Sequence, residues 1–260
     1  MNQEIYVHFH PDEHPFVDRA WEWVCKAAQN HVTRRTDFLD PRQAFILTTL
    51  ANRQGNVNLR LDGGYPEAER KRAFIAPDYR ILDEEDAGIA VVAITSGDNK
   101  FISLGHGDFL GAILGLGLKR EKIGDIHVWE QGCHCVVAAE IAEFIRIHLQ
   151  KVHRVHVQTE VLPPDRLKTV TPALQEINLA VASLRLDGIV SDVFRLSRAK
   201  VLSPIKSGKI KVNWKVEENP GKMLKEGDVV SMQGFGRFKV VQLDGVTKSG
   251  RYRLKVAKFV

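Results

Sequence analysis

The sequence predicts an α+β protein built from three parts. Helix patterns dominate residues 1–79, whereas strand and helix patterns alternate over residues 80–165. Charge separates the third part, because residues 181–260 hold 17 Lys and Arg against 7 Asp and Glu, a net charge of +10 against −5 for the rest. We therefore expect an N-terminal domain at 1–79, a middle domain at 80–165, a linker helix at 166–182 and a basic C-terminal module at 183–260.

The N-terminal domain is expected to be rich in helix. Residues 16–31 place apolar side chains near one face, as in an amphipathic helix. Asp40-Pro41 predicts the start of a second helix through Leu50, because Asp is a favourable N-cap and Pro fits the first turn. Residues 57–61 alternate like a strand, which Gly63-Gly64 is expected to end.

The middle domain shows a regular order of elements. Residues 88–95 form a continuous apolar run, typical of a buried strand. A helix at 106–118, a hairpin at 126–138, a helix at 139–149 and a strand at 155–161 follow. This order is the split βαβ pattern of ferredoxin-like and RRM-like folds. Pro163-Pro164 marks its end, and the linker helix is expected to open at Thr171-Pro172.

The C-terminal module carries four motifs in a fixed order: Arg185-Leu186-Asp187, Ser197-Arg198, the strand 209–214 after Gly208, and the turn and strand at 224–230. Together they resemble the S4 RNA-binding domain. Ser197 is expected to cap a helix, and Gly208 to end it in the left-handed conformation. Alternation along the strand predicts one basic face and one packed face.

Two residues depart from the S4 pattern. Pro204 stands where an aliphatic residue is usual, and a proline within a helix is expected to kink it. Trp214 occupies a position where a turn glycine is common. It is interpreted either as a base-stacking platform or as a core residue, and the core role is favoured.

Motifs along the whole chain look like the YlmH family of bacterial S4-domain proteins, encoded in the cell-division gene neighbourhood. They are Asp37–Pro41, Gly63-Gly64-Tyr65 with Ala68–Arg72, His106–Ala112 with Gly115–Gly117, and Lys119–Asp125. The resemblance implies a cytoplasmic factor that binds the large ribosomal subunit rRNA and tRNA, and that stabilises peptidyl-tRNA during ribosome-associated quality control. It implies no catalytic residue or cofactor, and we expect a monomer.

Clustered cations suit the phosphates of structured RNA, which is recognised by shape and backbone. Gly111, Gly115 and Gly117 precede a basic turn but form neither a Walker pattern nor Gly-x-Gly-x-x-Gly after a strand, which favours tight helix packing with an RNA-facing turn over a nucleotide-binding loop. The candidate RNA-contacting residues are Arg185, Arg195, Ser197, Arg198, Lys200, Lys206, Lys209, Lys211 and Asn213 in the C-terminal module, Lys119, Arg120 and Lys122 in the middle domain, and Arg70 and Arg72 in the N-terminal domain.

No metal site is expected. Cys133 and Cys135 alternate with His134 along one strand, and the chain lacks a second cysteine pair to complete four ligands. Buried structural cysteines are the favoured interpretation. Three cysteines also give no disulfide framework, which indicates a reducing, cytoplasmic setting. No apolar run approaches the ~20 residues needed to span a bilayer, and residues 1–4 do not resemble a signal peptide.

Two alternatives stay open. The first is an RNA-modifying enzyme, since S4 domains also occur in pseudouridine synthases and methyltransferases. Arg60-Leu61-Asp62 leads into Gly63-Gly64-Tyr65 rather than a synthase motif, and residues 96–99 lack the glycine-rich loop of a methyltransferase. The second is an adaptor in cell division. We expect a non-catalytic RNA-binding factor.

Overall fold

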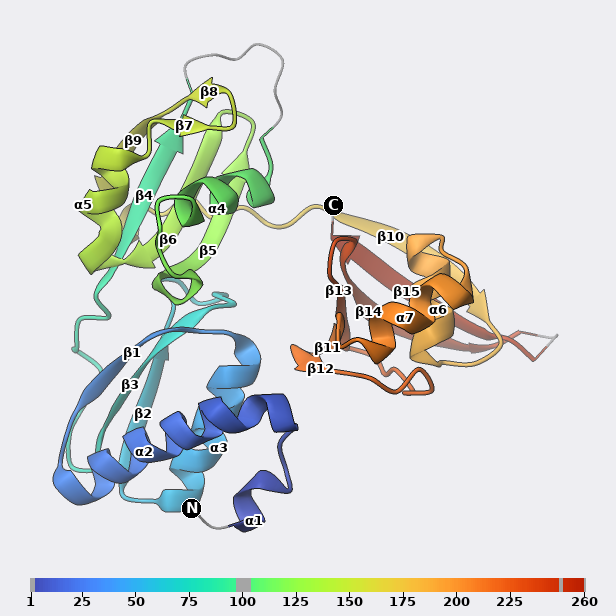
Figure 1. Cartoon of the computed structure of the whole chain (residues 1–260), viewed down its shortest axis with the longest axis horizontal. Coiled ribbons are helices and arrows are strands. Elements are labelled where there is room, and N and C mark those ends of the chain that lie inside the picture. The colour runs from blue at the N-terminus through green and yellow to red at the C-terminus, as the bar shows by residue number, and fades with distance from the viewer. Residues whose placement is uncertain (1–2, 97–103, 248–249, 260) are drawn as a thin grey trace. The chain divides into compact units, whose positions relative to one another are not determined.

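The computed structural model describes residues 3–96, 104–247 and 250–259 (Figure 1). Its contacts divide the chain into two compact units, residues 1–170 and 171–260. The first unit contains the N-terminal and middle domains, and each unit is described by itself. Residues 97–99, part of the segment compared with a methyltransferase loop, lie outside the described residues.

The N-terminal domain is a three-stranded antiparallel sheet, ordered β1-β3-β2, with two helices packed against it. Asp40 caps the second helix as predicted, since its carboxylate accepts the backbone N–H of Gln43 at 2.8 Å. The predicted helices and strand are confirmed. The elements are α1 (Gln3–Tyr6), η1 (Pro11–Glu13), α2 (His14–Asn30), β1 (Arg34–Leu39), α3 (Pro41–Gln54), β2 (Val57–Asp62) and β3 (Lys71–Pro77).

The middle domain is a four-stranded antiparallel sheet in the order β5-β6-β4-β9, with α4 and α5 packed on one face. The predicted split βαβ order is therefore confirmed. The elements are β4 (Ile89–Thr95), α4 (His106–Leu114), η2 (Arg120–Lys122), β5 (Ile123–Trp129), β6 (Gly132–Ala138), α5 (Ala139–His148), β7 (Lys151–Val152), β8 (Val155–His156), β9 (Gln158–Leu162) and η3 (Pro164–Arg166).

Two middle-domain predictions need correction. The helix that begins at His106 ends at Leu114 rather than Leu118, because the glycines that follow form a turn in which Gly117 has φ +85°. The predicted strand 155–161 is divided. Its first two residues pair with β7 in a short hairpin, and only β9 joins the main sheet.

The second unit is a six-stranded antiparallel sheet, ordered β10-β15-β14-β13-β11-β12, with α6 and α7 packed against a shared core. The elements are β10 (Leu174–Val181), α6 (Leu186–Phe194), α7 (Arg198–Lys206), β11 (Ile210–Val212), β12 (Lys215–Val216), β13 (Val229–Met232), β14 (Gly236–Val246) and β15 (Tyr252–Phe259).

The predicted linker helix at 166–182 is wrong. Residues 174–181 form strand β10, which pairs in continuous register with β15 from Leu174↔Phe259 to Val181↔Tyr252. Ile177, Leu179 and Val181 alternate along the chain and pack on the core of the unit. This period of two, together with the available edge of β15, outweighs the helix-start signal of Thr171-Pro172.

Candidate RNA-binding surfaces

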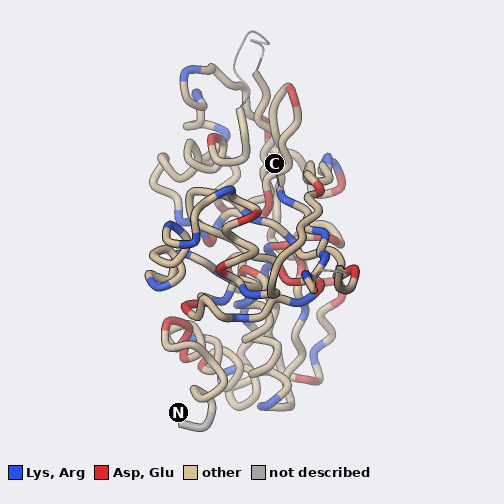
Figure 2. Tube along the Cα trace, turned by 90° about the vertical axis from the view of Figure 1, so that its right-hand side faces the viewer, with Lys and Arg blue, Asp and Glu red and all other residues tan. Residues whose placement is uncertain are grey.

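Six cations lie exposed on α7, on β11 and on the residues that flank them. Within the described residues, none of the six forms an ion pair. Unpaired, solvated cations on one helix and the adjacent strand are free to neutralise phosphates. We call this set the S4 basic face; it consists of Arg195, Arg198, Lys200, Lys206, Lys209 and Lys211. Lys and Arg positions are marked along the chain in Figure 2.

Local sequence signals position this face. The Ser197 hydroxyl accepts the Lys200 backbone N–H at 3.4 Å and caps α7, as predicted, while its role as an RNA contact stays a prediction. Arg195 ends α6 in the left-handed region with φ +53°. Gly208 has φ +67° just after α7, which confirms its predicted conformation. Pro204 lies within α7, two residues before the helix ends.

Asn213 and Trp214 form the turn between β11 and β12, and both have positive φ, +50° and +63°. The Asn213 amide donates to Asp228 and accepts the Val229 N–H, at 2.8 and 2.9 Å. Asn213 therefore stabilises the turn, and because it is exposed its role as an RNA contact stays a prediction. Trp214 is half-buried in this turn and is not among the residues of the S4 core or packed on it, so the favoured core role is corrected.

Arg185 forms a two-point ion pair with Asp187, with both nitrogen–oxygen distances 3.1 Å. Asp187 is buried at the start of α6 and also accepts the backbone N–H of Gly188. Burial would raise the pKa of Asp187, but the bonds from Arg185 and Gly188 lower it overall. The Arg185 guanidinium therefore pairs with the carboxylate at the start of α6. Part of the Arg185 side chain is still exposed, and its role as an RNA contact stays a prediction.

The first unit contains a polar cleft of about 980 Å³ between the two domains. Strand β1 runs along it, with α2 on the N-terminal side and η2 and the start of α5 on the middle-domain side. Seven basic and five acidic side chains line it. They are Arg19, Arg34, Arg35, Arg70, Arg72, Arg120 and Lys122, and Glu22, Asp37, Asp40, Glu121 and Glu140.

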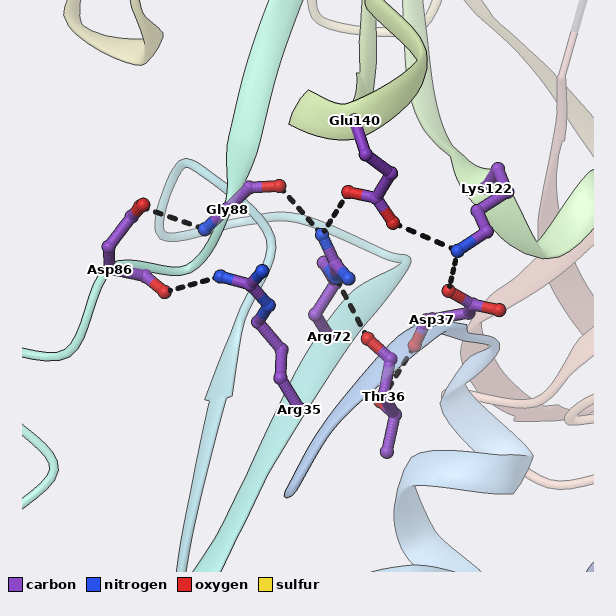
Figure 3. Close-up of polar contacts among 8 residues, drawn as sticks. All are labelled: Arg35, Thr36, Asp37, Arg72, Asp86, Gly88, Lys122 and Glu140. Atoms are coloured by element: carbon purple, nitrogen blue, oxygen red, sulfur yellow. Dashed lines mark hydrogen bonds and ion pairs between the residues drawn. The ribbon is translucent and has the colours of Figure 1, made fainter. Parts of the chain in front are cut away.

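Arg72 holds the two domains of this unit together (Figure 3). Its side chain is 3% exposed and donates to the carbonyl oxygens of Thr36 at 2.8 Å and Gly88 at 2.6 Å, and to Glu140 at 3.4 Å. Burial lowers the pKa of Arg72, while the Glu140 charge opposes that shift. Because the guanidinium is buried and occupied, the prediction that Arg72 contacts RNA is wrong.

Lys122 continues the same network (Figure 3). Its ammonium contacts the carboxylates of Asp37 at 2.6 Å and Glu140 at 2.8 Å, and these bonds raise the pKa of Lys122. Burial would raise the pKa of Glu140, but the bonds from Lys122 and the charge of Arg72 lower it to about 2. Lys122 is thus paired with carboxylates, which makes it a weak candidate for phosphate contact.

The remaining basic candidates of this unit differ in exposure. Lys119 is exposed at the start of η2. Arg120 and Arg70 are half-buried in the cleft wall, where they donate to backbone carbonyls. Their predicted role in RNA binding stays a prediction.

The cleft also contains residues that the sequence did not single out. Arg34 lies over the ring of Trp23 at 4.8 Å, and Arg19 lies over Phe16 at 5.8 Å. The only sequence signal was the Arg34-Arg35 pair, which resembles any solvated basic pair. Arg34 on β1 and the aromatic residues of α2 come together only through the packing of α2 beside β1.

The cysteine-containing strand has the predicted alternation. Cys133 and Cys135 are buried in the helix-facing core, and burial raises the pKa of the Cys135 thiol to about 12. His134 faces the other side and accepts the backbone N–H of Lys168 at 2.9 Å. No group of three or more His, Cys, Asp or Glu among the described residues is arranged to hold a metal. No helix in the described part of the chain is long and apolar enough to cross a membrane.

Fold and surface together define an RNA-binding protein of the S4 type. Family models match in three consecutive segments: "YlmH, N-terminal" at residues 12–80, "Putative RNA-binding domain in YlmH" at 83–165 and "S4 domain" at 184–230. The chain belongs to the YlmH family.

Two relatives support this assignment. The chain is 38% identical over 251 residues to "Ribosome-associated protein quality control protein P2" of Bacillus subtilis, covering 96% of this chain and 97% of that protein. It is also similar to the solved structure "Cell division protein ylmH from Streptococcus pneumoniae", at 28% identity and a TM-score of 0.52. That match covers 62% of this chain and 98% of the other.

Proposed function

We propose that this protein is a non-catalytic factor that binds the rRNA of the large ribosomal subunit together with tRNA, and that stabilises peptidyl-tRNA during ribosome-associated quality control. The observation that carries the proposal is the S4 basic face, with six exposed cations that make no ion pair within the described residues. The name of the Bacillus relative supports the setting of ribosome-associated quality control.

Arg198 has a specific place in this proposal. Its guanidinium lies close enough to α6 that a Cβ added at Gly188 would be 3.4 Å from its Nη2 atom. Arg198 is therefore positioned by the helix beneath it while staying exposed, and Lys209 is exposed just before β11. A positioned guanidinium and a nearby ammonium suit adjacent phosphates of a folded RNA, which a protein reads through shape and backbone.

The test is sedimentation of the full chain with ribosomal subunits in a translation-arrested lysate. The protein should co-migrate with large subunits, more strongly when they hold peptidyl-tRNA. The variant Arg198→Glu/Lys209→Glu should shift to the free fraction. Lys151→Glu/Arg154→Glu provides a control with the same charge change at exposed positions of the first unit, and should sediment like the wild type.

Two results would contradict the proposal. One is migration only with small subunits or wholly in the free fraction at physiological salt. The other is a folded Arg198→Glu/Lys209→Glu variant that sediments like the wild type. The first result would favour the alternative of an RNA-modifying enzyme.

A further inference from the structure

Two arginines of the cleft converge on one carbonyl oxygen. Arg70 donates from Nε to the carbonyl of Ile123 at 3.0 Å, and Arg120 donates from Nη1 to the same oxygen. Arg70 also donates from Nη2 to the carbonyl of Phe38 at 3.0 Å. Two like charges are thus held side by side by neutral acceptors, with no salt bridge to a carboxylate among the described residues.

The carboxylate of Asp125 lies near both arginines and its charge favours their charged forms, but its hydrogen bonds come from other groups. It accepts the hydroxyl of Tyr65 at 2.8 Å and the backbone N–H groups of Glu69 at 2.7 Å and Arg70 at 3.2 Å. Burial and the neighbouring Arg70 charge lower the pKa of Arg120 to about 10. Holding two partly desolvated guanidiniums together is unfavourable unless an anion neutralises them.

The other carboxylates of the cleft are mostly occupied as well. Asp37 and Glu140 pair with Lys122, and Glu22 pairs with Lys26 at the α2 surface. Asp40 caps α3, yet its charge, like the charges of Asp125, Glu69 and Glu121, stabilises the charged form of Arg70. None of these carboxylates forms a salt bridge with Arg70 or Arg120 among the described residues, so the two guanidiniums have no direct anionic partner.

The arginines retain donors for a ligand. A guanidinium has five N–H groups, and Arg70 uses two of them on carbonyl oxygens. Farther along the cleft, exposed Arg34 lies against half-buried Trp23. A cation beside an aromatic ring is a common contact surface for a nucleotide.

We propose that Arg70 and Arg120 bind a backbone phosphate of a single-stranded RNA segment in this cleft, with Arg34 and Trp23 contacting a neighbouring nucleotide. The inference rests on the proposed RNA-binding function and adds a second site, separate from the S4 basic face. A single strand fits because its phosphates and bases turn freely into a cleft of about 980 Å³. An A-form duplex is recognised instead on its outer surface.

The test uses the full chain carrying Arg198→Glu/Lys209→Glu, which weakens the S4 basic face. Its affinity for a short fluorescent oligouridylate is measured by anisotropy at low ionic strength. Adding Arg34→Gln/Arg120→Gln should weaken binding by about tenfold or more, since charge-assisted hydrogen bonds are lost. Lys151→Gln/Arg154→Gln removes the same charge outside the cleft and should change affinity less than about twofold.

A second measurement requires no cleft variant. Oligouridylate containing 4-thiouridine is photocrosslinked to the same S4-weakened chain, and the crosslinked peptides are identified by mass spectrometry. Crosslinks should fall in segments 19–40, 65–72 and 119–125. No crosslink in those segments, or unchanged affinity of a folded cleft variant, would overturn the proposal. The sedimentation test depends on the S4 basic face, whereas these two measurements depend on the cleft, so failure of one proposal can be distinguished from failure of the other.

Discussion

Replacement of Arg72 by methionine tests whether the buried guanidinium joins the two domains of the first unit. Methionine keeps a long, flexible side chain but removes every donor. The carbonyl oxygens of Thr36 and Gly88 lose their bonds to Arg72, and Glu140 keeps only its pairing with Lys122. The fold loses the contacts that join β3 to β1, to α5 and to Gly88 just before β4.

The magnitude follows from this inventory. Arg72 is 3% exposed, so water does not replace the lost donors without local rearrangement. Leaving a buried acceptor unsatisfied typically costs about 1–3 kcal/mol, and here the carbonyl oxygens of Thr36 and Gly88 both lose their donor. We therefore expect the free energy of unfolding of this unit to fall by about 2–5 kcal/mol. Arg72→Lys should cost less, because it keeps the charge while losing the planar arrangement of donors.

Urea unfolding followed by tryptophan fluorescence measures this change. Three of the four tryptophans lie in the first unit, at positions 21, 23 and 129, and Trp214 lies in the second. A Trp214→Phe background therefore confines the signal to the first unit. Lys151→Met, at an exposed position, is the control and should shift stability by less than about 0.5 kcal/mol. A loss below about 1 kcal/mol for Arg72→Met would refute the conclusion that Arg72 holds the two domains of the first unit together.

Three further predictions follow from the same structure. Folding lowers the pKa of Glu140, so its contribution to stability should be present above the ordinary pKa of 4.5 and be lost as pH falls toward about 2. In fluorescence-monitored unfolding, Glu140→Gln should therefore be less stable than the wild type at neutral pH and lose less stability over that acidic range. Asn213→Ala should destabilise the second unit by about 1–3 kcal/mol, since it removes two hydrogen bonds at a left-handed position, and faster amide exchange in β11 and β13 would reveal it. Arg198→Gln should reduce by about one the slope of log affinity against log salt for ribosomal RNA, measured by filter binding; an unchanged slope would exclude a phosphate contact by Arg198.

The local parts of the fold were predictable from sequence because their signals are local. The Asp40-Pro41 cap, the Ser197 cap and the left-handed Gly208 each depend on a few neighbouring residues. Strand β10 was misassigned because its identity depends on pairing with β15 at the far end of the chain. A Thr-Pro helix signal contains no information about that partner.

The same distinction divides the candidate site. The exposed cations of α7 and β11 follow from capping and alternation, so the sequence located them. The burial of Arg72 does not follow from such local signals, because its acceptors are the carbonyl oxygens of Thr36 on β1 and of Gly88 between the two domains. Asn213 similarly has the composition of an RNA contact, but its partner Asp228 lies 15 residues away and occupies the amide.

The two proposed surfaces use arginine in different physical states. On the S4 basic face the cations are exposed and unpaired among the described residues, so they attract phosphates at long range and their affinity falls as salt rises. In the cleft, backbone carbonyls hold Arg70 and Arg120 before any ligand arrives, so little side-chain entropy is lost on binding. Because one chain carries both surfaces, attachment through the first raises the effective concentration of RNA at the second. Even a low affinity of the cleft for RNA would then suffice to select RNA that has a single strand beside a structured element.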